Sequence, residues 1–181
     1  LYVNYDYPLT DGEMDQYRER IMQRANRIPV AYITGTIEFM SLEFEVNQEV
    51  LLPRPETEVL VEEVISICKD REIDEPHIVD VGTGSGAIMV SLGYNLKEAK
   101  ILGIDVSESI LEVVRNNIGK YELGERLKVI RGDLLKPLLQ MHKDNVDIVV
   151  SNPPYIKEEE LPNLPPEVKQ APKRALNGGK E

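Results

Sequence analysis

Apolar and polar residues follow two different periods in the first part of the chain. Residues 10–26 are largely polar with apolar residues at helical spacing, and Thr10 and Glu13 stand where a capping box would begin a helix. Residues 36–46 instead alternate between apolar and polar positions. This alternation is typical of strands, so the chain is predicted to continue from a helix into a short β-hairpin.

A second helix is predicted over residues 60–68, after Pro53 and Pro55. Its apolar residues recur at helical spacing, and prolines are favoured just before a helix or in its first turn. Cys68 lies on the apolar side of this helix. We therefore interpret the cysteine as a core residue and not as a nucleophile.

From residue 77 onward, short β-branched runs alternate with helical stretches. Strands are predicted over residues 77–81, 101–105, 127–133 and 146–152, and helices over 87–96 and 107–118. Strands that alternate with helices form a parallel sheet whose C-terminal strand ends share one edge. The fold class is therefore α/β, a doubly wound and mainly parallel sheet preceded by a helix and a hairpin. Prolines crowd the last twenty residues, which predicts a loop there and a sheet that is incomplete at the C-terminus.

Composition excludes several classes of protein. The 181 residues include 21 Lys and Arg against 32 Asp and Glu, and the resulting net charge of −11 disfavours binding to the phosphates of DNA or RNA. No apolar run approaches the roughly 20 residues of a membrane span, and one cysteine allows no internal disulfide, so we expect a cytoplasmic protein. The chain starts at Leu1 and its first methionine, Met14, falls within the predicted helix, which indicates a shortened chain.

The segment between the first strand of the sheet and the following helix, Asp80 to Gly86, is DVGTGSG. Glycines let a ligand approach the backbone, and the helix N-terminus offers free N–H groups. A tight turn that needs glycine only for its dihedral angles is the alternative. Asp105 ends the next strand, 19 residues after Gly86, where a doubly wound fold places a carboxylate that accepts hydrogen bonds from ribose hydroxyls. Together the two features predict a nucleotide-like cofactor.

Spacing and charge narrow the choice of cofactor. Glycines at 82, 84 and 86 follow G-x-G-x-G, whereas the dinucleotide fingerprint is G-x-G-x-x-G, which disfavours a dehydrogenase. The carboxylate of Asp80 would repel a pyrophosphate but suits a ligand with an ammonium group, and S-adenosylmethionine carries one. Asp133, at the end of the third strand, either accepts a hydrogen bond from the adenine amino group or caps a turn.

The end of the fourth strand carries the most specific motif, Asn152-Pro153-Pro154-Tyr155. Consecutive prolines stiffen the loop and lack N–H groups, so their carbonyls only accept hydrogen bonds beside the Asn152 carboxamide. A planar amide could donate its hydrogens to Asn152 and to a proline carbonyl while the Tyr155 ring packs against it. A proline-rich surface loop is the alternative.

These motifs together carry a family resemblance. DVGTGSG, Asp105 and SNPPY resemble class I S-adenosylmethionine-dependent methyltransferases, which have a Rossmann-like fold and here would modify an exocyclic or amide nitrogen. RIPVAYITGTIEF at 27–39 and LLPRPETEVLVE at 51–62 resemble segments of the release-factor glutamine methyltransferases, the HemK or PrmC family. The resemblance implies methyl transfer to the side-chain amide nitrogen, N5, of the glutamine in the Gly-Gly-Gln motif of class 1 peptide chain release factors. It implies no direct nucleic-acid or membrane partner.

The same resemblance implies domains and site residues. Residues 1–28 would be the remnant of an N-terminal helical domain, 29–50 a β-hairpin linker, and 51–181 a truncated S-adenosylmethionine-dependent methyltransferase domain. The cofactor would contact Asp80, Gly82, Thr83, Gly84, Ser85, Gly86, Asp105, Asp133, Leu134 and Asn152. The acceptor glutamine would contact Asn152, Pro153, Pro154 and Tyr155, with Asn152, Pro153 and Tyr155 as catalytic residues. No metal is expected.

Some positions depart from the family pattern or allow two interpretations. Leu134 stands where the family often has an aromatic residue, and Ala171 where a Glu is usual. Glu56 and Glu58 either favour a helix N-terminus by their charge or belong to a loop over the cofactor, and Arg54 could contact either ligand. Two other functions stay open, amino methylation of adenine in DNA and cofactor binding by an inactive fragment. We expect the chain by itself to have impaired activity.

Overall fold

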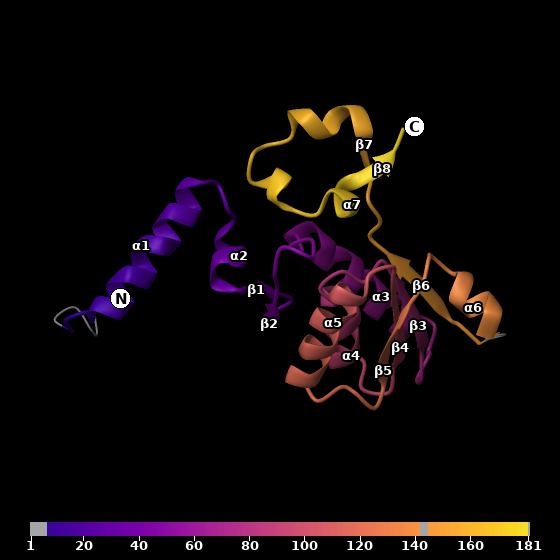
Figure 1. Ribbon diagram of the computed structural model, residues 1–181. Coiled ribbons are helices and arrows are strands. Elements are labelled where there is room, and N and C mark those ends of the chain that lie inside the picture. Colours follow the sequence, from indigo (N-terminus) through magenta and orange to yellow (C-terminus); the bar gives the residue numbers. More distant parts are fainter. Residues whose placement is uncertain (1–6, 142–144, 181) are drawn as a thin grey trace.

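A central parallel sheet organises the structure, a computed structural model that describes residues 7–141 and 145–180 (Figure 1). Its strands lie in the order β5-β4-β3-β6. They are β3 (His77–Val81), β4 (Lys100–Asp105), β5 (Leu127–Arg131) and β6 (Ile148–Ser151). All three pairings are parallel, with Ile78 beside Ile101 on one side and Val81 beside Ser151 on the other. The predicted α/β fold with four parallel strands is confirmed.

Helices cover both faces of the sheet, but unequally. The helices on one face are α3 (Glu58–Asp70), α4 (Ala87–Asn95) and α5 (Glu108–Lys120). They form the main core with the hairpin, and Ile78 of β3 belongs to it. The next residue, Val79, points to the opposite face, where Leu138 of α6 (Lys136–Met141) belongs to a smaller core. The sheet is therefore doubly wound, and one short helix covers the second face.

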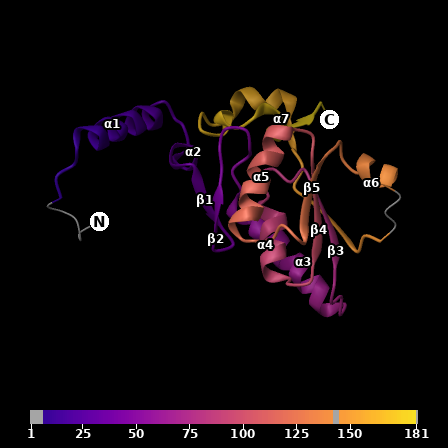
Figure 2. The ribbon, with the colours of Figure 1, turned by 60° about the horizontal axis from the view of Figure 1, so that its bottom comes forward.

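The N-terminal helix begins at the predicted capping box. α1 (Asp11–Ala25) starts after Thr10, whose Oγ1 accepts a hydrogen bond of 3.3 Å from the N–H of Glu13. Oε2 of Glu13 accepts one of 2.8 Å from the N–H of Thr10 in return. No residue of α1 is buried, and the helix projects away from the sheet in both ribbon views (Figures 1 and 2). Local capping, and not packing, fixes where this helix begins.

The predicted hairpin is present, and a short helix precedes it. β1 (Thr36–Phe39) pairs antiparallel with β2 (Leu42–Glu45), and Met40 and Ser41 between them have φ of 52° and 58°. Positive φ at both turn residues matches the twist of the two strands. α2 (Val30–Thr34) was not predicted, although it lies within the range assigned to the hairpin linker. Five residues are too few for a helical period to appear in the sequence.

The segment after β6 folds back above the C-terminal ends of the strands (Figures 1 and 2). It contains β7 (Ile156–Lys157), η2 (Glu158–Asn163), η3 (Val168–Gln170), α7 (Lys173–Leu176) and β8 (Asn177–Gly179), where η denotes a 3₁₀ helix. The prediction of a loop was therefore wrong here, because elements of two to six residues leave no periodic pattern. β7 and β8 pair only with each other, so the described central sheet keeps four strands.

Candidate functional site

A cavity of about 230 Å³ opens at the C-terminal ends of the parallel strands. β3 lies between β4 and β6, and ligands of open α/β sheets bind where the strand order reverses in this way. The predicted site residues that line the cavity are Gly82, Gly84, Asp105, Asp133, Leu134, Asn152, Pro153 and Pro154. The predicted residues outside its lining are Asp80, Thr83, Ser85, Gly86 and Tyr155. Residues from all four strand ends therefore meet at one place.

The glycine turn has open space above its first two glycines and none at the third. Gly82 and Gly84 have φ of 73° and 56°, and a Cβ built on either would meet no atom closer than 3.9 Å. Gly86 has φ of 79°, and a Cβ there would lie 2.8 Å from Cγ1 of Val114 in α5. The first two glycines thus leave room for a ligand against the backbone, whereas the third allows α4 to begin close to α5.

Asp105 is held at the cavity by the backbone of two turns. Its Oδ2 accepts a hydrogen bond of 3.3 Å from the N–H of Gly84, and its Oδ1 accepts one of 3.3 Å from the N–H of Ser107. Each carboxylate oxygen has a further lone pair for a ligand. The side chain can therefore accept hydrogen bonds from a pair of hydroxyls while its orientation stays fixed.

Asp80 is fully buried next to the turn. Its Oδ2 accepts a hydrogen bond of 2.8 Å from the hydroxyl of Thr83, and its Oδ1 has no hydrogen-bond partner within the described parts of the chain. Burial raises the pKa of Asp80 to about 7, while the Thr83 hydroxyl and the backbone of Met89 lower it and the nearby charge of Asp105 raises it. A donor brought close to Oδ1 would favour the ionised carboxylate.

Asn152 lies at the junction of two hollows. With Pro153 it lines the cavity, and it also lines a smaller adjoining hollow together with Arg54 and Tyr155. The Nδ2 of Asn152 donates a hydrogen bond of 3.3 Å to Oγ1 of Thr57. The side chain of Tyr155 is largely exposed on the side of the smaller hollow. Asn152 is therefore the polar side chain that the two hollows share.

Asp133 and Leu134 lie after β5, at an exposed side of the cavity. Oδ2 of Asp133 forms an ion pair with Nζ of Lys136, and both side chains are exposed. Leu134 is 62% exposed and has φ of 51°. The contact with Lys136 supports the interpretation of Asp133 as a turn residue, and its contact with adenine stays a prediction.

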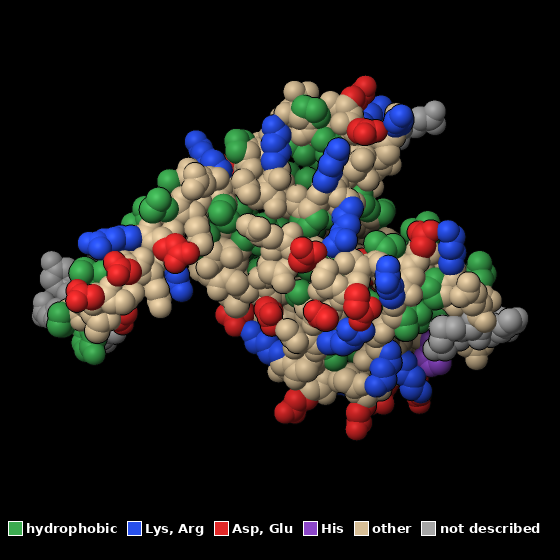
Figure 3. Space-filling view, in the orientation of Figure 1, with side chains coloured by type: hydrophobic (Ala, Val, Ile, Leu, Met, Phe, Trp, Pro, Cys, Tyr) green, Lys and Arg blue, Asp and Glu red, His purple; other side chains and the backbone are tan. Residues whose placement is uncertain are grey.

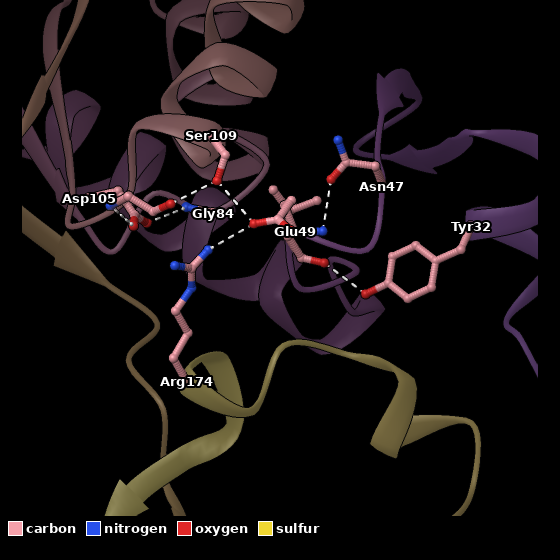
Figure 4. Close-up of polar contacts among 9 residues, drawn as sticks. Tyr32, Asn47, Glu49, Gly84, Asp105, Ser109 and Arg174 are labelled. Carbon is pink, nitrogen blue, oxygen red and sulfur yellow. Dashed lines mark hydrogen bonds and ion pairs between the residues drawn. The ribbon is translucent and has the colours of Figure 1, made fainter.

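The sequence did not indicate Glu49 and Arg174, whose side chains point toward each other (Figure 4). Arg174 of α7 lines the cavity, and its Nη2 lies 3.3 Å from Oε2 of Glu49. The same oxygen of Glu49 accepts a hydrogen bond of 3.0 Å from Oγ of Ser109 in α5. Because Glu49 and Arg174 are 125 positions apart, spacing in the sequence carries no signal of this contact.

Asn117, also missed, connects the glycine turn to the hairpin. Its Nδ2 donates hydrogen bonds to the carbonyls of Ser85, over 2.8 Å, and Glu45, over 3.0 Å. Its Oδ1 accepts a hydrogen bond of 2.7 Å from the N–H of Glu45. The side chain is fully buried in α5. A polar residue between the apolar residues of a predicted helix was the signal that could have revealed it.

Two kinds of feature are absent from residues 7–141 and 145–180. Within these ranges, no three side chains of His, Cys, Asp or Glu are grouped so that they could hold a metal ion. No helix within them combines the length and the apolar composition that a membrane span requires.

Comparison with known proteins identifies the family of this fold and site. Residues 78–174, more than half of the chain, match the family described as "Methyltransferase domain". The chain belongs to this methyltransferase family. Residues 1–35 of the methyltransferase also match the PrmC N-terminal domain.

Similar curated proteins are named release factor glutamine methyltransferase. The protein of Clostridium botulinum is 38% identical over 182 residues, and that of Clostridium acetobutylicum 40% identical over 183 residues. Each alignment covers 100% of this chain and 63% of the relative, so the chain spans less than two thirds of these relatives. The resemblance seen in residues 27–39 and 51–62 is therefore confirmed over the whole methyltransferase chain.

Solved structures support the fold alone, because their sequence identity is low. The hMettl16 catalytic domain in complex with MAT2A 3'UTR hairpin 6 has a TM-score of 0.60 at 17% identity, covering 94% of this chain and 58% of that one. The N-terminal domain of human METTL16 in complex with SAH has a TM-score of 0.50 at 22% identity, covering 78% and 56%. These similarities show that the methyltransferase shares its overall fold with the two domains, and they carry no information about its substrate.

Proposed function

We propose that this protein transfers a methyl group from S-adenosylmethionine to the side-chain amide nitrogen of the glutamine in the Gly-Gly-Gln motif of class 1 release factors. The observation that carries the proposal is the shared cavity, in which Asn152 and Pro153 line the same space as Gly84 and Asp105. The names of the similar curated proteins support the choice of substrate. Such a substrate would place the enzyme in the cytoplasm.

The residues around the cavity fit an adenosyl cofactor. The open space above Gly82 and Gly84 would admit it against the backbone, and Asp105 would accept hydrogen bonds from its ribose hydroxyls. Asp133 and Leu134 would lie near the adenine. The human METTL16 domain, which has the same fold, was solved with SAH, and this supports the choice of cofactor. Asp80, Thr83, Ser85 and Gly86 lie outside the cavity lining, and their contact with the cofactor stays a prediction.

The acceptor amide would lie against the Asn152 and Pro153 side of the cavity. An amide nitrogen is a weak nucleophile because its lone pair is delocalised into the carbonyl. Oδ1 of Asn152 and the carbonyl of Pro153 would accept hydrogen bonds from its two hydrogens, which gain positive character as the nitrogen is methylated. These acceptors therefore bind the transition state more strongly than the ground state, and no separate base is needed before the bond forms.

When bound, the cofactor would supply an electrophilic methyl group on a positively charged sulfur. The amide nitrogen would take this group by direct in-line displacement without a covalent enzyme intermediate, the carbon–sulfur bond would break to release S-adenosylhomocysteine, and the methylated nitrogen would lose one hydrogen to water as a proton. The protein's part is to hold the amide at the right distance and angle and to exclude competing orientations. Pro153 and Pro154 limit the backbone of the loop, and Tyr155 would pack against the planar group.

Adenine in DNA offers a similar amino group and is the competing acceptor. The net charge of −11 opposes binding to a duplex. Figure 3 shows Lys and Arg side chains interspersed with Asp and Glu over the face in view. Such a surface favours a protein substrate over a nucleic acid, which would need a concentrated basic groove.

A two-step experiment tests the proposal. Calorimetry with S-adenosylmethionine measures binding, and a radiolabelled methyl group then reports transfer to a purified class 1 release factor. Because we expect the chain by itself to have impaired activity, we expect slow labelling of the release factor, none of a release factor whose motif glutamine is changed to alanine, and none of DNA. In Asn152→Ala, cofactor binding should persist while transfer falls at least 100-fold.

Three results would reject the assignment. Label on DNA but not on the release factor would favour adenine methylation. Cofactor binding without transfer to either would leave only a binding function. Unchanged turnover in Asn152→Ala would remove the proposed role of this side chain.

A further inference from the structure

Thr57 contacts Asn152 from a segment far away in the sequence. It ends the 3₁₀ turn η1 (Pro55–Thr57), within the PETE sequence that follows Arg54. Its Oγ1 accepts the hydrogen bond of 3.3 Å from Nδ2 of Asn152, across 95 positions of the chain. Both residues are partly buried. The contact joins the segment before α3 to the loop after β6.

The segment that carries Thr57 is anchored at both ends. Upstream, the hydroxyl of Tyr32 donates a hydrogen bond of 2.7 Å to the carbonyl of Val50. Downstream, Oε1 of Glu58 accepts one of 2.6 Å from the N–H of Met40 in the hairpin turn. Because α2 and the hairpin hold the segment in this way, the Thr57 hydroxyl has a defined position relative to β6.

The contact with Thr57 gives the nitrogen and the oxygen of the Asn152 carboxamide different surroundings. Nδ2 is directed to Thr57, whereas Oδ1 has no hydrogen-bond partner among residues 7–141 and 145–180. An asparagine side chain turns readily about its last torsion, so one fixed end reduces the orientations that the free end samples. Oδ1 is thereby kept available as an acceptor beside the cavity.

We propose that Thr57 is a positioning residue for methyl transfer, holding the carboxamide of Asn152 so that its oxygen meets the N–H of the acceptor amide. The inference rests on the proposed function and adds a role for the PRPETE segment. Thr57 acts through Asn152 and touches neither the cofactor nor the methyl group. Its loss should therefore lower the rate of the chemical step more than the binding of either ligand.

The test compares Thr57→Val, which removes the hydroxyl and keeps the shape, with Thr57→Ser, which keeps the hydroxyl. Thr57→Val should lower kcat about five-fold, the effect of one lost hydrogen bond of ordinary strength, with KM for the release factor and the affinity for S-adenosylmethionine changed less than about two-fold. Thr57→Ser should recover most of kcat. Thr34→Val is the matched control, because the Thr34 hydroxyl bonds only within and next to α2.

An NMR measurement reports the contact without any turnover. The side-chain NH₂ signals of Asn152, assigned by their loss in Asn152→Ala, should shift in Thr57→Val and keep their position in Thr57→Ser and Thr34→Val. A kcat in Thr57→Val within two-fold of the original, or an equal loss in Thr57→Ser, overturns the positioning role. A parallel loss of cofactor affinity would also overturn it, because Thr57 would then support the fold. If the protein without substitutions does not methylate release factors, the proposed function is rejected, and the positioning role of Thr57 is rejected with it.

Discussion

Nδ2 of Asn117 donates a hydrogen bond of 2.8 Å to the backbone carbonyl of Ser85 and so joins α5 to the middle of the glycine turn. The same side chain bonds both backbone groups of Glu45 in β2. One buried carboxamide therefore fixes the turn against the hairpin. The loss of Asn117 would therefore disturb both the glycine turn of the candidate site and the packing of the hairpin on α5.

Replacing Asn117 with alanine should lower the free energy of unfolding by about 2 to 3 kcal/mol, because buried backbone groups lose their partners. Urea unfolding measures the change. Asn116→Ala is the matched control. Asn116 is exposed and bonds the carboxylate of Glu45, so its loss should cost less than about 0.5 kcal/mol. Equal effects of the two substitutions would contradict the structural role of Asn117.

Gly84→Ala and Gly86→Ala should have different consequences. At position 86 the new Cβ would lie 2.8 Å from Cγ1 of Val114, and the alanine would have to keep a positive φ. We therefore expect the free energy of unfolding to fall by about 3 kcal/mol. At Gly84 only the backbone strain of about 1 kcal/mol applies, but the methyl group would occupy the open space of the cavity. Gly84→Ala should therefore lose affinity for S-adenosylmethionine, by calorimetry, while it unfolds near the original urea concentration. If Gly84→Ala were less stable to urea than Gly86→Ala, the different roles assigned to the two glycines would be wrong.

Asp80 should make stability depend on pH below neutrality. Its pKa is raised by burial from 3.8 to about 7 in the folded protein. Between these values the unfolded chain loses this proton while the folded protein keeps it, so the contribution of Asp80 to stability falls as the pH rises from about 4 to about 7. Asp80→Asn removes that contribution, and its unfolding free energy relative to the original should rise over this window and level off above it. A constant difference, measured by urea unfolding across the window, would contradict the raised pKa.

The ion pair of Glu49 and Arg174 should matter more for local order than for global stability. Both side chains are about half exposed, so Arg174→Ala should change the unfolding free energy by less than about 1 kcal/mol. The substitution removes the contact between α7 and the loop after β2, and amide exchange in residues 173–179 should become faster. Lys173→Ala is the neighbouring control and should leave exchange unchanged. If amide exchange in residues 173–179 were as slow in Arg174→Ala as in the original protein, the prediction would be wrong, and other contacts would hold the segment.

Short-range patterns predicted much of the fold. The alternation in residues 36–46 predicted the hairpin, and Thr10 with Glu13 predicted the start of α1. The β-branched runs predicted all four central strands, and the connection rules predicted that their C-terminal ends would share an edge. The glycine turn, Asp105 and Asn152 were found in the same way, because each follows directly after a strand and therefore reaches that edge.

The amino-acid sequence by itself determined the elements that depend on neighbouring residues: the capped helix, the alternating strands and the turns at their ends. Only the tertiary structure decided which distant residues meet, including Asn152 with Thr57, Asn117 with Ser85, and Arg174 with Glu49. It also separated Gly84 from Gly86, which have the same sequence signature but face a cavity and a helix respectively. The physical reason is that a hydrogen bond or a steric contact acts over a few ångströms in space, whereas periodicity records only the neighbours along the chain.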